Sequence, residues 1–183
     1  MKFTPQKIPD LVLIEPTIRN DSRGYFLETF RQESLEEAIG NKINFVQDNE
    51  SMSTKGVLRG LHYQLPPFTQ SKLIRVVYGE ILDVAVDVRK NSDTFGKHVA
   101  VHLNENNKNQ LYIPNGFAHG FIVLSDIAIV CYKTDNYYER NSERGILFSD
   151  NQLNIDWRLP INEILVSEKD KVQPRFSYEK SYL

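Results

Sequence analysis

The chain has 183 residues, of which 40% are hydrophobic and 25% are charged, a composition typical of a folded domain and not of a disordered segment. Its 22 Lys and Arg against 24 Asp and Glu give a net charge of −2, which excludes a surface that coats nucleic acid. The single cysteine, Cys131, excludes an intramolecular disulfide and a cysteine-based zinc site. We therefore expect a single domain over residues 1–183, with its own hydrophobic core and no nucleic-acid partner.

The N-terminus lacks the apolar stretch of a signal peptide, and no run in the chain approaches the roughly 18 apolar residues of a membrane span. We expect a cytoplasmic protein with no membrane partner. Further along, residues 11–15 are apolar and short and are followed by Pro16, which predicts an edge strand. One helix is expected over residues 34–40, where Ser34 and Glu37 fit a capping box and Gly40 a C-terminal stop.

Short apolar or alternating runs then dominate the middle of the chain. They are separated by turn sequences such as Pro66-Pro67 and Pro114-Asn115-Gly116. Short strands at close spacing predict an antiparallel sandwich or barrel, followed after Trp157 by irregular structure that wraps on it. The predicted strands are residues 57–63, 72–77, 81–88, 98–103, 110–113, 118–124 and 127–132.

The strand over residues 81–88 carries two aspartates on one face. Its even-numbered residues are all apolar, whereas Asp83 and Asp87 alternate with Ile81 and Ala85 on the other face. Two aspartates argue against a second core-facing side. That face is either in solvent or lines a polar barrel lumen, where a ligand would bind.

Two of the four histidines, His62 and His119, lie at or near predicted strands beside glycines. Metal sites in barrels gather at least three His or carboxylate ligands, commonly with two histidines one residue apart on a strand. Gln64 and Phe121 occupy the positions two residues after these histidines. We therefore expect no metal site.

Without a metal, a lumen with histidine, lysine, tyrosine and carboxylates points to proton transfer. His62 is suited to act as a base near neutral pH, and Tyr132 as a half-buried phenolic acid. Each candidate also has an ordinary interpretation: Tyr132 finishes a strand, Lys72 is solvated, and Asp170 is the acidic residue of a capping box begun by Ser167. Spacing alone does not decide between these readings.

Nine short motifs together resemble one family. In chain order they are DSRGYFLE (21–28), FVQDN (45–49), VLRGLHYQ (57–64), KLIRV (72–76), DVAVD (83–87), IPNGFAHGF (113–121), YK (132–133), DW (156–157) and SEKD (167–170). Each motif is weak alone, but in register over nearly the whole chain they resemble dTDP-4-dehydrorhamnose 3,5-epimerases. The resemblance implies a cupin-type jelly-roll barrel, all-β with a few short peripheral helices, a homodimer, and no cofactor or metal.

The resemblance also assigns roles in catalysis. The substrate would be a dTDP-linked 4-keto-6-deoxy sugar, whose ketone acidifies the hydrogens on C3 and C5. His62 matches the base, Asp170 the carboxylate that orients it, and Lys72 the cation beside the 4-oxygen. Tyr132 matches the acid that returns a proton from the opposite ring face, which inversion requires. By the alternation described above, we expect Asp83 to face the lumen and pair with Lys72.

The remaining matches concern substrate binding. Arg23 and Arg59 match diphosphate contacts, because a guanidinium fits phosphate oxygens, and His119 matches a residue near the sugar and phosphate. In the family the partner's N-terminal segment approaches the nucleotide site. Further matches to polar contacts and base-packing aromatics are Phe26, Glu28, Gln47, Asn49, Tyr138, Glu143 and Lys169.

A straight strand would place Arg59 and His62 on opposite faces, so we expect a bulge at Gly60. Two other functions stay open at this point. One is an epimerase that acts on C3 or C5 alone, or on another nucleotide-linked keto sugar. The other is a non-catalytic cupin sugar-binding module, which would be expected to have lost His62 or Tyr132.

Overall fold

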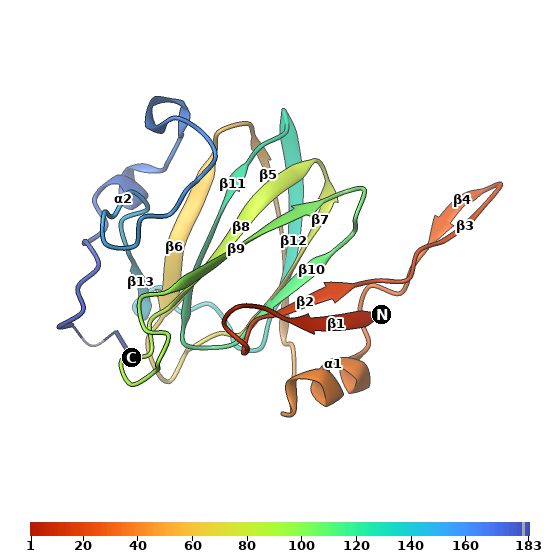
Figure 1. Ribbon diagram of the computed structural model, residues 1–183, viewed down its shortest axis with the longest axis horizontal. Helices are drawn as coiled ribbons and strands as arrows, with labels where there is room; N and C mark the ends of the chain where they lie inside the picture. Colours follow the sequence, from red (N-terminus) through yellow and green to blue (C-terminus); the bar gives the residue numbers. More distant parts are fainter. Residues whose placement is uncertain (181) are drawn as a thin grey trace.

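Two antiparallel β-sheets lie face to face in the computed structural model, which describes residues 1–180, 182 and 183 (Figure 1). In this part of the chain, one sheet has six strands in the order β1-β2-β10-β7-β12-β5, and the other has five in the order β13-β6-β11-β8-β9. The strands of the larger sheet are β1 (Lys2–Pro5), β2 (Val12–Glu15), β5 (Gln47–Thr54), β7 (Lys72–Tyr78), β10 (Gln110–Ile113) and β12 (Ile127–Thr134). Those of the smaller sheet are β6 (Leu58–Gln64), β8 (Glu80–Asp87), β9 (His98–Asn104), β11 (Phe117–Val123) and β13 (Glu143–Gly145).

All seven predicted strands are present within a few residues of their expected bounds. Helical structure in the described residues is limited to α1 (Gln32–Ile39), α2 (Glu168–Lys171) and the 3₁₀ turn η1 (Ile161–Glu163). No helix in this part of the chain has the length and apolar character needed to cross a membrane. The expectation of an all-β jelly roll with a few short peripheral helices is confirmed.

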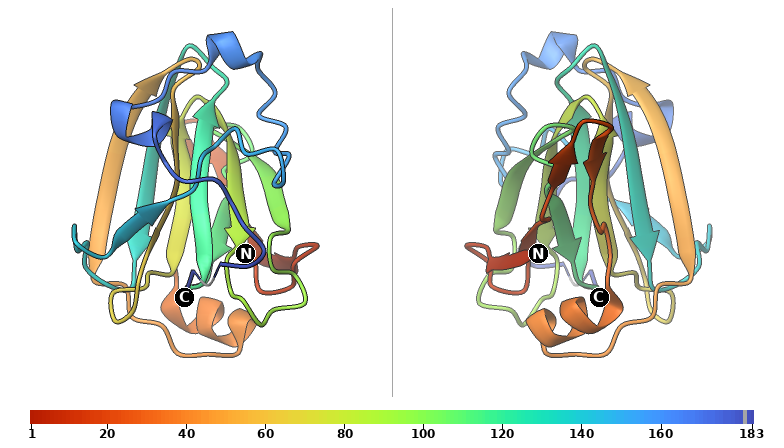
Figure 2. Two further views of the ribbon diagram at one scale, coloured as in Figure 1. Left: turned by 90° about the vertical axis from the view of Figure 1, so that its left-hand side faces the viewer. Right: turned by 90° about the vertical axis from the view of Figure 1, so that its right-hand side faces the viewer.

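The two sheets enclose a space between them (Figure 2), and the side chains that fill it form an apolar core and, beside it, a polar cavity. The core side chains come from alternate residues of strands in both sheets, as the two-residue period of a strand requires. They include Ile74, Val76, Ile81, Ala85, Leu111, Ile113, Phe117, Phe121, Ala128 and Val130. Beyond them, inward-facing positions of the same strands carry the polar residues of the site.

Both faces of β8 are buried. Leu82, Val84 and Val86 pack beneath the C-terminal part of the chain, in a cluster with Trp157 and Phe176. The argument that the alternating aspartates exclude a second buried face is therefore wrong. It fails because each aspartate has a partner inside the protein: Asp83 Oδ1 lies 2.7 Å from His119 Nε2, and Asp87 accepts hydrogen bonds from Arg89. The alternative of a polar lumen is the one that the structure supports.

Helix α1 differs from the prediction at its N-terminal end and agrees with it at its C-terminal end. Arg31 is the N-cap and its side chain makes no capping bond, while Ser34 lies inside the helix, so the capping box of Ser34 and Glu37 is wrong. Gly40, in the left-handed conformation, donates its N–H to Glu36 O and ends the helix as expected. The helix is anchored instead by Leu35, which is fully buried beside Val12, Ile14 and Tyr112.

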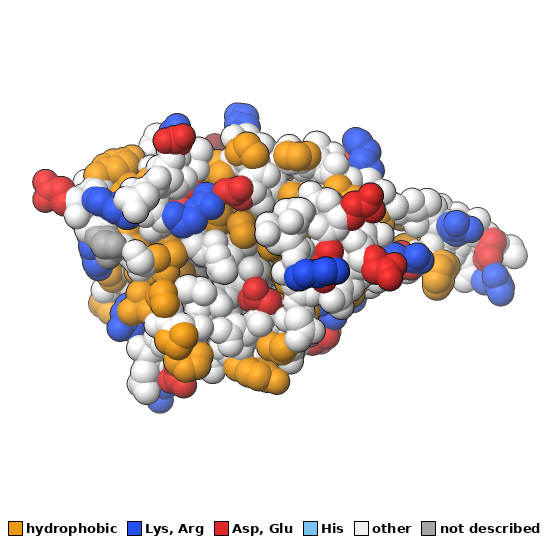
Figure 3. All heavy atoms as spheres, turned by 90° about the horizontal axis from the view of Figure 1, so that it is seen from below, with side chains coloured by type: hydrophobic (Ala, Val, Ile, Leu, Met, Phe, Trp, Pro, Cys, Tyr) orange, Lys and Arg blue, Asp and Glu red, His pale blue; other side chains and the backbone are white. Residues whose placement is uncertain are grey.

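The N-terminal region also corrects one expectation. Strand β2 pairs with β1 on one side and β10 on the other, so residues 11–15 do not form an edge strand; β1 does. The next two strands, β3 (Arg19–Asp21) and β4 (Gly24–Phe26), form a hairpin that extends away from the body of the molecule (Figures 1 and 3). Tyr25 and Phe26 on this hairpin are exposed.

Candidate active site

Two adjoining cavities open between the sheets, with volumes of about 510 and 280 Å³. They share three side chains, His62, Lys72 and Tyr132, which are three of the four predicted catalytic residues. The fourth, Asp170, lines the larger cavity. The strand order explains this meeting. His62 stands on β6 in the smaller sheet, whereas Lys72 and Tyr132 stand on the neighbouring strands β7 and β12 of the larger one.

A local irregularity in β6 directs two of its side chains into the cavity. The pairing of β6 with β11 shifts register between the His119 and Phe121 positions, and Gly60 has a φ of 127°, which favours glycine. A Cβ at Gly60 would lie 2.5 Å from the Cα of Gly120, so no larger residue fits. As a result both Arg59 and His62 line the cavity, which confirms the expected bulge.

His62 and Asp170 form a close pair. The His62 Nε2 atom lies 2.6 Å from Asp170 Oδ1. Burial by itself would raise the pKa of Asp170, but its contacts with His62, with Ser167 and with the backbone of Gly60 outweigh burial and lower it. An ionised carboxylate only accepts, so Nε2 of His62 carries a proton and donates it, leaving Nδ1 as the basic nitrogen.

Asp170 reaches His62 on a strap formed by residues 161–171. The strap is held to the barrel by backbone bonds in which Leu165 donates to Gly56 and accepts from Leu58. Ser167 caps α2 by accepting the N–H of Asp170 through its side chain. Only the Ser167 half of the predicted capping box is present, because the carboxylate of Asp170, its acidic member, pairs with His62 as the family resemblance implies.

Lys72 is half-buried at the junction of the two cavities, on the inward face of β7. Burial lowers its pKa to about 8, although the negative charges of Asp83 and Glu143 act in the opposite direction. No carboxylate in the described residues lies within ion-pair distance of its Nζ. The expected pairing of Lys72 with Asp83 is therefore wrong, and the lysine is left to interact with whatever enters the cavity.

Tyr132 projects from the inward face of β12, opposite Asn49 of β5. Burial raises the pKa of its phenol, nearby Arg59 lowers it, and Glu143 raises it further, with a net rise. The hydroxyl is therefore protonated at neutral pH and able to donate a proton to a group in the cavity.

A second His–Asp pair lies behind the first. His119 of β11 stands directly opposite His62 in the strand register, and its Nε2 is 2.7 Å from Asp83 Oδ1. Burial lowers the pKa of His119 despite the opposing effect of Asp83. The partner of Asp83 follows from the sheet order: His119 and Asp83 are diagonal neighbours on paired strands, while Lys72 belongs to the other sheet.

The smaller cavity is polar. Gln47 donates through Nε2 to Asn49 Oδ1, at 2.7 Å. Tyr138 donates its hydroxyl to Glu143, which also forms an ion pair with Lys169 of the strap. Burial would raise the pKa of Glu143, but these two contacts outweigh it and lower the pKa. All of these predicted binding residues therefore lie beside the catalytic candidates.

Three predicted binding residues lie elsewhere in the chain. Arg23 forms an ion pair with Asp21 on the projecting hairpin, and Glu28 forms one with Arg31. Phe26 is 70% exposed, so a core role for it is excluded. None of the three lines the two cavities that hold His62.

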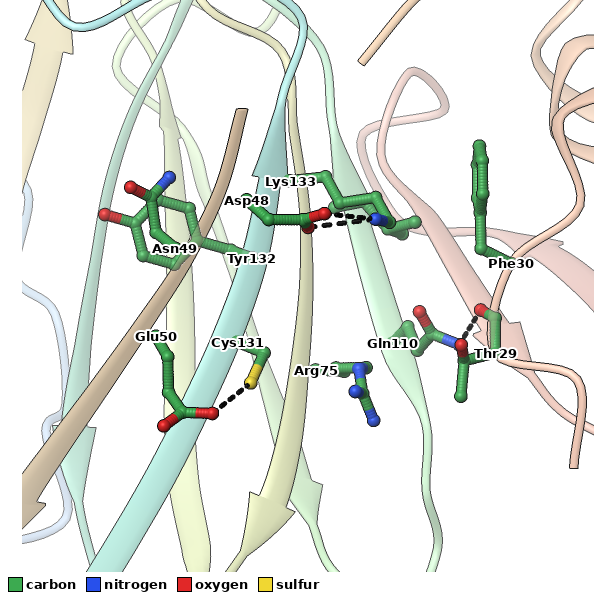
Figure 4. A pocket seen from close by; sticks show the side chains of 11 residues that line it. Thr29, Phe30, Asp48, Asn49, Glu50, Arg75, Gln110, Cys131, Tyr132 and Lys133 are labelled. Carbon is green, nitrogen blue, oxygen red and sulfur yellow. Dashed lines mark hydrogen bonds and ion pairs between the residues drawn. The ribbon is translucent and has the colours of Figure 1, made fainter. Parts of the chain in front are cut away.

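A third cavity, of about 320 Å³, lies on the outer face of the six-stranded sheet (Figure 4). There Lys133 pairs with Asp48, and Cys131 contacts Glu50 at 3.4 Å. Tyr132 and Asn49 also line this cavity. The residues on either side of them along β12 and β5, such as Cys131 and Glu50, point away from the side of the sheet that faces His62. No histidine lines this cavity, and its Lys133 and Asp48 are already paired with each other, so it offers no base that titrates near neutral pH and does not compete with the site between the sheets.

Sequence reasoning missed part of the site. Ser51 lines the larger cavity and Gln70 the smaller one, and neither was predicted. Ser51 follows Gln47 and Asn49 at two-residue spacing along β5, a signal that becomes readable only once these residues are known to form a strand. In the described residues no group of three or more His, Cys, Asp or Glu side chains could hold a metal ion.

Comparisons with known proteins agree with this geometry. The sequence matches the family described as dTDP-4-dehydrorhamnose 3,5-epimerase over residues 5–178. The enzyme of that name from Shigella flexneri is 57% identical over 170 residues, which cover 93% of each chain. The crystal structure of dTDP-4-dehydrorhamnose 3,5-epimerase from Elizabethkingia anophelis has a TM-score of 0.94 and 47% identity, covering 100% of this chain and 99% of that one.

The Legionella pneumophila dTDP-6-deoxy-D-glucose-3,5-epimerase, solved in complex with dTDP-4-keto-L-rhamnose, has a TM-score of 0.89 and 46% identity, covering 96% of this chain and 98% of that one. These similarities extend over nearly the whole chain and include both sheets that form the cavity. The chain belongs to the dTDP-4-dehydrorhamnose 3,5-epimerase family.

Proposed function

We propose that this protein epimerises dTDP-4-dehydro-6-deoxy-D-glucose at C3 and C5 and so forms dTDP-4-dehydro-L-rhamnose. The observation that carries the proposal is the position of the two proton carriers. His62 enters the cavity from the five-stranded sheet and Tyr132 from the six-stranded sheet. A sugar ring held between them has the base on one face and the acid on the other, as inversion of a carbon centre requires.

The reaction begins with His62. Its Nδ1 takes the hydrogen from C3 or C5 as a proton, and the C–H electron pair moves into an enolate with the negative charge on the 4-oxygen. Asp170 stabilises the imidazolium that results, because its carboxylate is 2.6 Å from Nε2. Lys72, which has no carboxylate partner of its own, stabilises the enolate oxygen.

Tyr132 completes the inversion. Its hydroxyl donates a proton to the carbon from the opposite ring face, and the enolate collapses back to the ketone with the new configuration. The phenolate then regains a proton from solvent, while His62 releases the one it took. The same base and acid serve both carbons if the sugar presents each in turn.

The nucleotide part of the substrate needs cations for its two phosphates. Arg59, which lines the larger cavity, is one candidate, since in the described residues its guanidinium bonds only to Ser53 Oγ, at 3.1 Å. Gln47, Asn49, Tyr138, Glu143 and Lys169 supply polar contacts in the smaller cavity. Arg23, Phe26 and Glu28 lie outside the cavities of their own chain, and the family resemblance implies that they reach the site of a partner subunit.

A homodimer follows from that arrangement. The projecting hairpin β3–β4 exposes Tyr25 and Phe26, and packing against a second copy would cover both side chains. We expect sedimentation to give a dimer at micromolar concentration, and a stable monomer would contradict this. A single catalytic domain over residues 1–183, a cytoplasmic location and the absence of a cofactor, nucleic-acid or membrane partner stay predictions from the sequence.

The decisive experiment is proton NMR of the dTDP-linked keto sugar with the protein in heavy water, coupled to a reductase that traps the product. We expect deuterium at both C3 and C5 and reduction to the L-rhamno product. Deuterium at one carbon alone would indicate a mono-epimerase, and no exchange at all would indicate a non-catalytic sugar-binding module.

A further inference from the structure

The site contains two His–Asp pairs of nearly the same geometry. The Nε2-to-Oδ1 distance is 2.6 Å for His62 and Asp170 and 2.7 Å for His119 and Asp83. The first histidine is partly exposed, with 27% of its side chain accessible, whereas the second has 9%. The two rings are cross-strand neighbours, and both line the larger cavity.

The contact with Asp83 decides which nitrogen of His119 carries a proton. A carboxylate accepts and does not donate, so the proton of the His119 ring lies on Nε2, the atom bonded to Asp83. Nδ1 is then left with its lone pair as long as the ring is neutral. In the described residues no donor is bonded to that atom, so it is free to accept from a ligand.

The surroundings of His119 keep the ring neutral. The charged or titratable groups that act on it are Asp83 from β8, His62 from β6 and Lys72 from β7. Burial lowers the pKa of His119 most, Asp83 opposes that effect, and the neighbouring Lys72 and His62 add to it. A second proton on this ring would also place a cation beside the lysine and the base.

A neutral imidazole with a free lone pair recognises a donor, not an anion. The diphosphate of the substrate has acceptor oxygens only, so it cannot donate to Nδ1. The hydroxyls on the sugar ring can. Because His119 pairs with His62 in the strand register and lines the same cavity, the sugar on which His62 acts is the part of the substrate that we expect next to His119.

Building on the proposed function, we propose that Asp83 is a positioning residue that fixes His119 as a hydrogen-bond acceptor for a ring hydroxyl of the sugar. His119 then selects the hydroxylated sugar and does not bind phosphate. Asp83 Oδ1 makes the bond to His119, while Oδ2 is buried and has no partner in the described residues, so His119 is the hydrogen-bond donor that this carboxylate serves.

Two substitutions of His119 separate this role from a structural one. His119→Asn places an amide oxygen near the position of Nδ1 but cannot reach Asp83. His119→Gln reaches Asp83 with its amide but leaves no acceptor at Nδ1. We expect kcat/KM for the keto sugar to fall about tenfold more in His119→Gln than in His119→Asn, the effect of one lost hydrogen bond. The reverse order would overturn the proposal, because it is the order expected if His119 only supports Asp83.

Binding of dTDP alone, measured by calorimetry, serves as the control for phosphate recognition. We expect both variants to bind dTDP as the unsubstituted protein does. A loss of dTDP affinity in both would assign His119 to the diphosphate and overturn the proposal. Absence of turnover in the unsubstituted protein would instead refute the proposed function, with the dTDP result still interpretable.

Two measurements on the unsubstituted protein remain informative even if the variants do not fold. The ¹⁵N spectrum of the histidine rings should show His119 with a protonated Nε2 and an unprotonated Nδ1 near neutral pH; a protonated Nδ1 would overturn the proposal. Substrate analogues that lack the hydroxyl at C2 or at C3 can be compared with the natural sugar by deuterium exchange at C5. We expect at least one of them to exchange with a lower kcat/KM. If neither analogue loses efficiency, no ring hydroxyl is bound by His119.

Discussion

Asp83 and Asp87 lie four residues apart on the same face of β8, and both are completely buried. Asp87 accepts hydrogen bonds from the backbone N–H and guanidinium of Arg89, at 2.7–2.9 Å, and from the hydroxyls of Ser92 and Thr94, both at 2.6 Å. Asp83 accepts one, from His119, and its second oxygen has no partner in the described residues.

The number of hydrogen-bond partners distinguishes Asp87, a structural carboxylate, from Asp83, which we propose positions a residue of the site. Burial would raise the pKa of Asp87, but its bonds to Arg89, Ser92 and Thr94 outweigh burial and lower it. Together with Asp10, which pairs with Arg89, these residues form what we call the Asp87 cluster. The cluster fixes a loop and offers no free atom. The partner of Asp83, in contrast, lines the cavity that holds the proposed base His62, the proposed acid Tyr132 and Lys72, which has no ion pair in the described residues.

The largest expected effect comes from the cavity side of this comparison. Replacing His62 with Ala removes the base from one ring face, and we expect kcat to fall by about 10³–10⁴ and deuterium exchange at C3 and C5 to stop. Because the variant also leaves the buried Asp170 carboxylate without its partner, the free energy of unfolding should fall by about 1–3 kcal/mol. Exchange at the normal rate in a folded variant would show that another group is the base.

Tyr132→Phe should have a smaller and different effect. The ring remains, so packing is retained, but the acid on the opposite face is lost. We expect net inversion to slow by about 10²–10³, while His62 still takes a proton and returns one to the same face. NMR in heavy water should therefore detect deuterium uptake without matching product. Inversion of both centres at the usual rate would make Tyr132 a structural aromatic.

On the structural side, Asp87→Ala should lower the free energy of unfolding by about 3 kcal/mol, because it leaves Arg89 partly buried without its main partner. The kcat of the folded protein should be unchanged, since the cluster does not line the cavity. Asp93→Ala is the matched control, because Asp93 is exposed on the same loop. Urea unfolding checks the predicted loss of stability, and steady-state kinetics check the unchanged kcat. A large fall in kcat would show that Asp87 is not purely structural.

The pH dependence sharpens the contrast further. Burial lowers the pKa of Lys72 to about 8, so its charge is lost as the pH rises through 8, and kcat/KM should then fall up to about tenfold per pH unit. Stability should move the other way. Between pH 8 and the usual lysine pKa of 10.5, the unfolded chain binds more protons at this residue than the folded one, so its contribution to the free energy of unfolding rises.

A Lys72→Gln variant supplies the control, because it has no ammonium to lose. Its residual kcat/KM should lack the decline assigned to Lys72. If the unsubstituted protein and this variant lose activity in parallel above pH 8, the decline belongs to another group.

The strands that face an apolar core could be predicted from sequence, because their alternation is visible in the residue types. Strand β5 could not. Its inward residues Gln47, Asn49 and Ser51 are polar because they line the cavity, and its outward residues are polar as well, so no alternation of hydrophobicity marks it. The roles of His62, Lys72 and Tyr132 came from a family resemblance, since their spacing in the sequence carries no information on distance in space.

Two further features needed the three-dimensional structure. The orientation of Asp83 followed from strand alternation, but its choice of His119 over Lys72 depends on the lateral order of strands, which local sequence does not specify. The start of α1 is set by the burial of Leu35 and not by a capping side chain, so a capping motif at Ser34 misplaced it.

The strap that carries Asp170 has a consequence for how the protein becomes active during its synthesis. His62 and Asp170 are separated by 108 positions in the chain, and the strap is held by Gly56 and Leu58, which are neighbours of His62 and not of Asp170 in sequence. A ribosome therefore completes both sheets before the base acquires its carboxylate. The pair of His62 and Asp170 can therefore form only after translation has passed residue 170, so on the proposed mechanism a shorter nascent chain has no activated base.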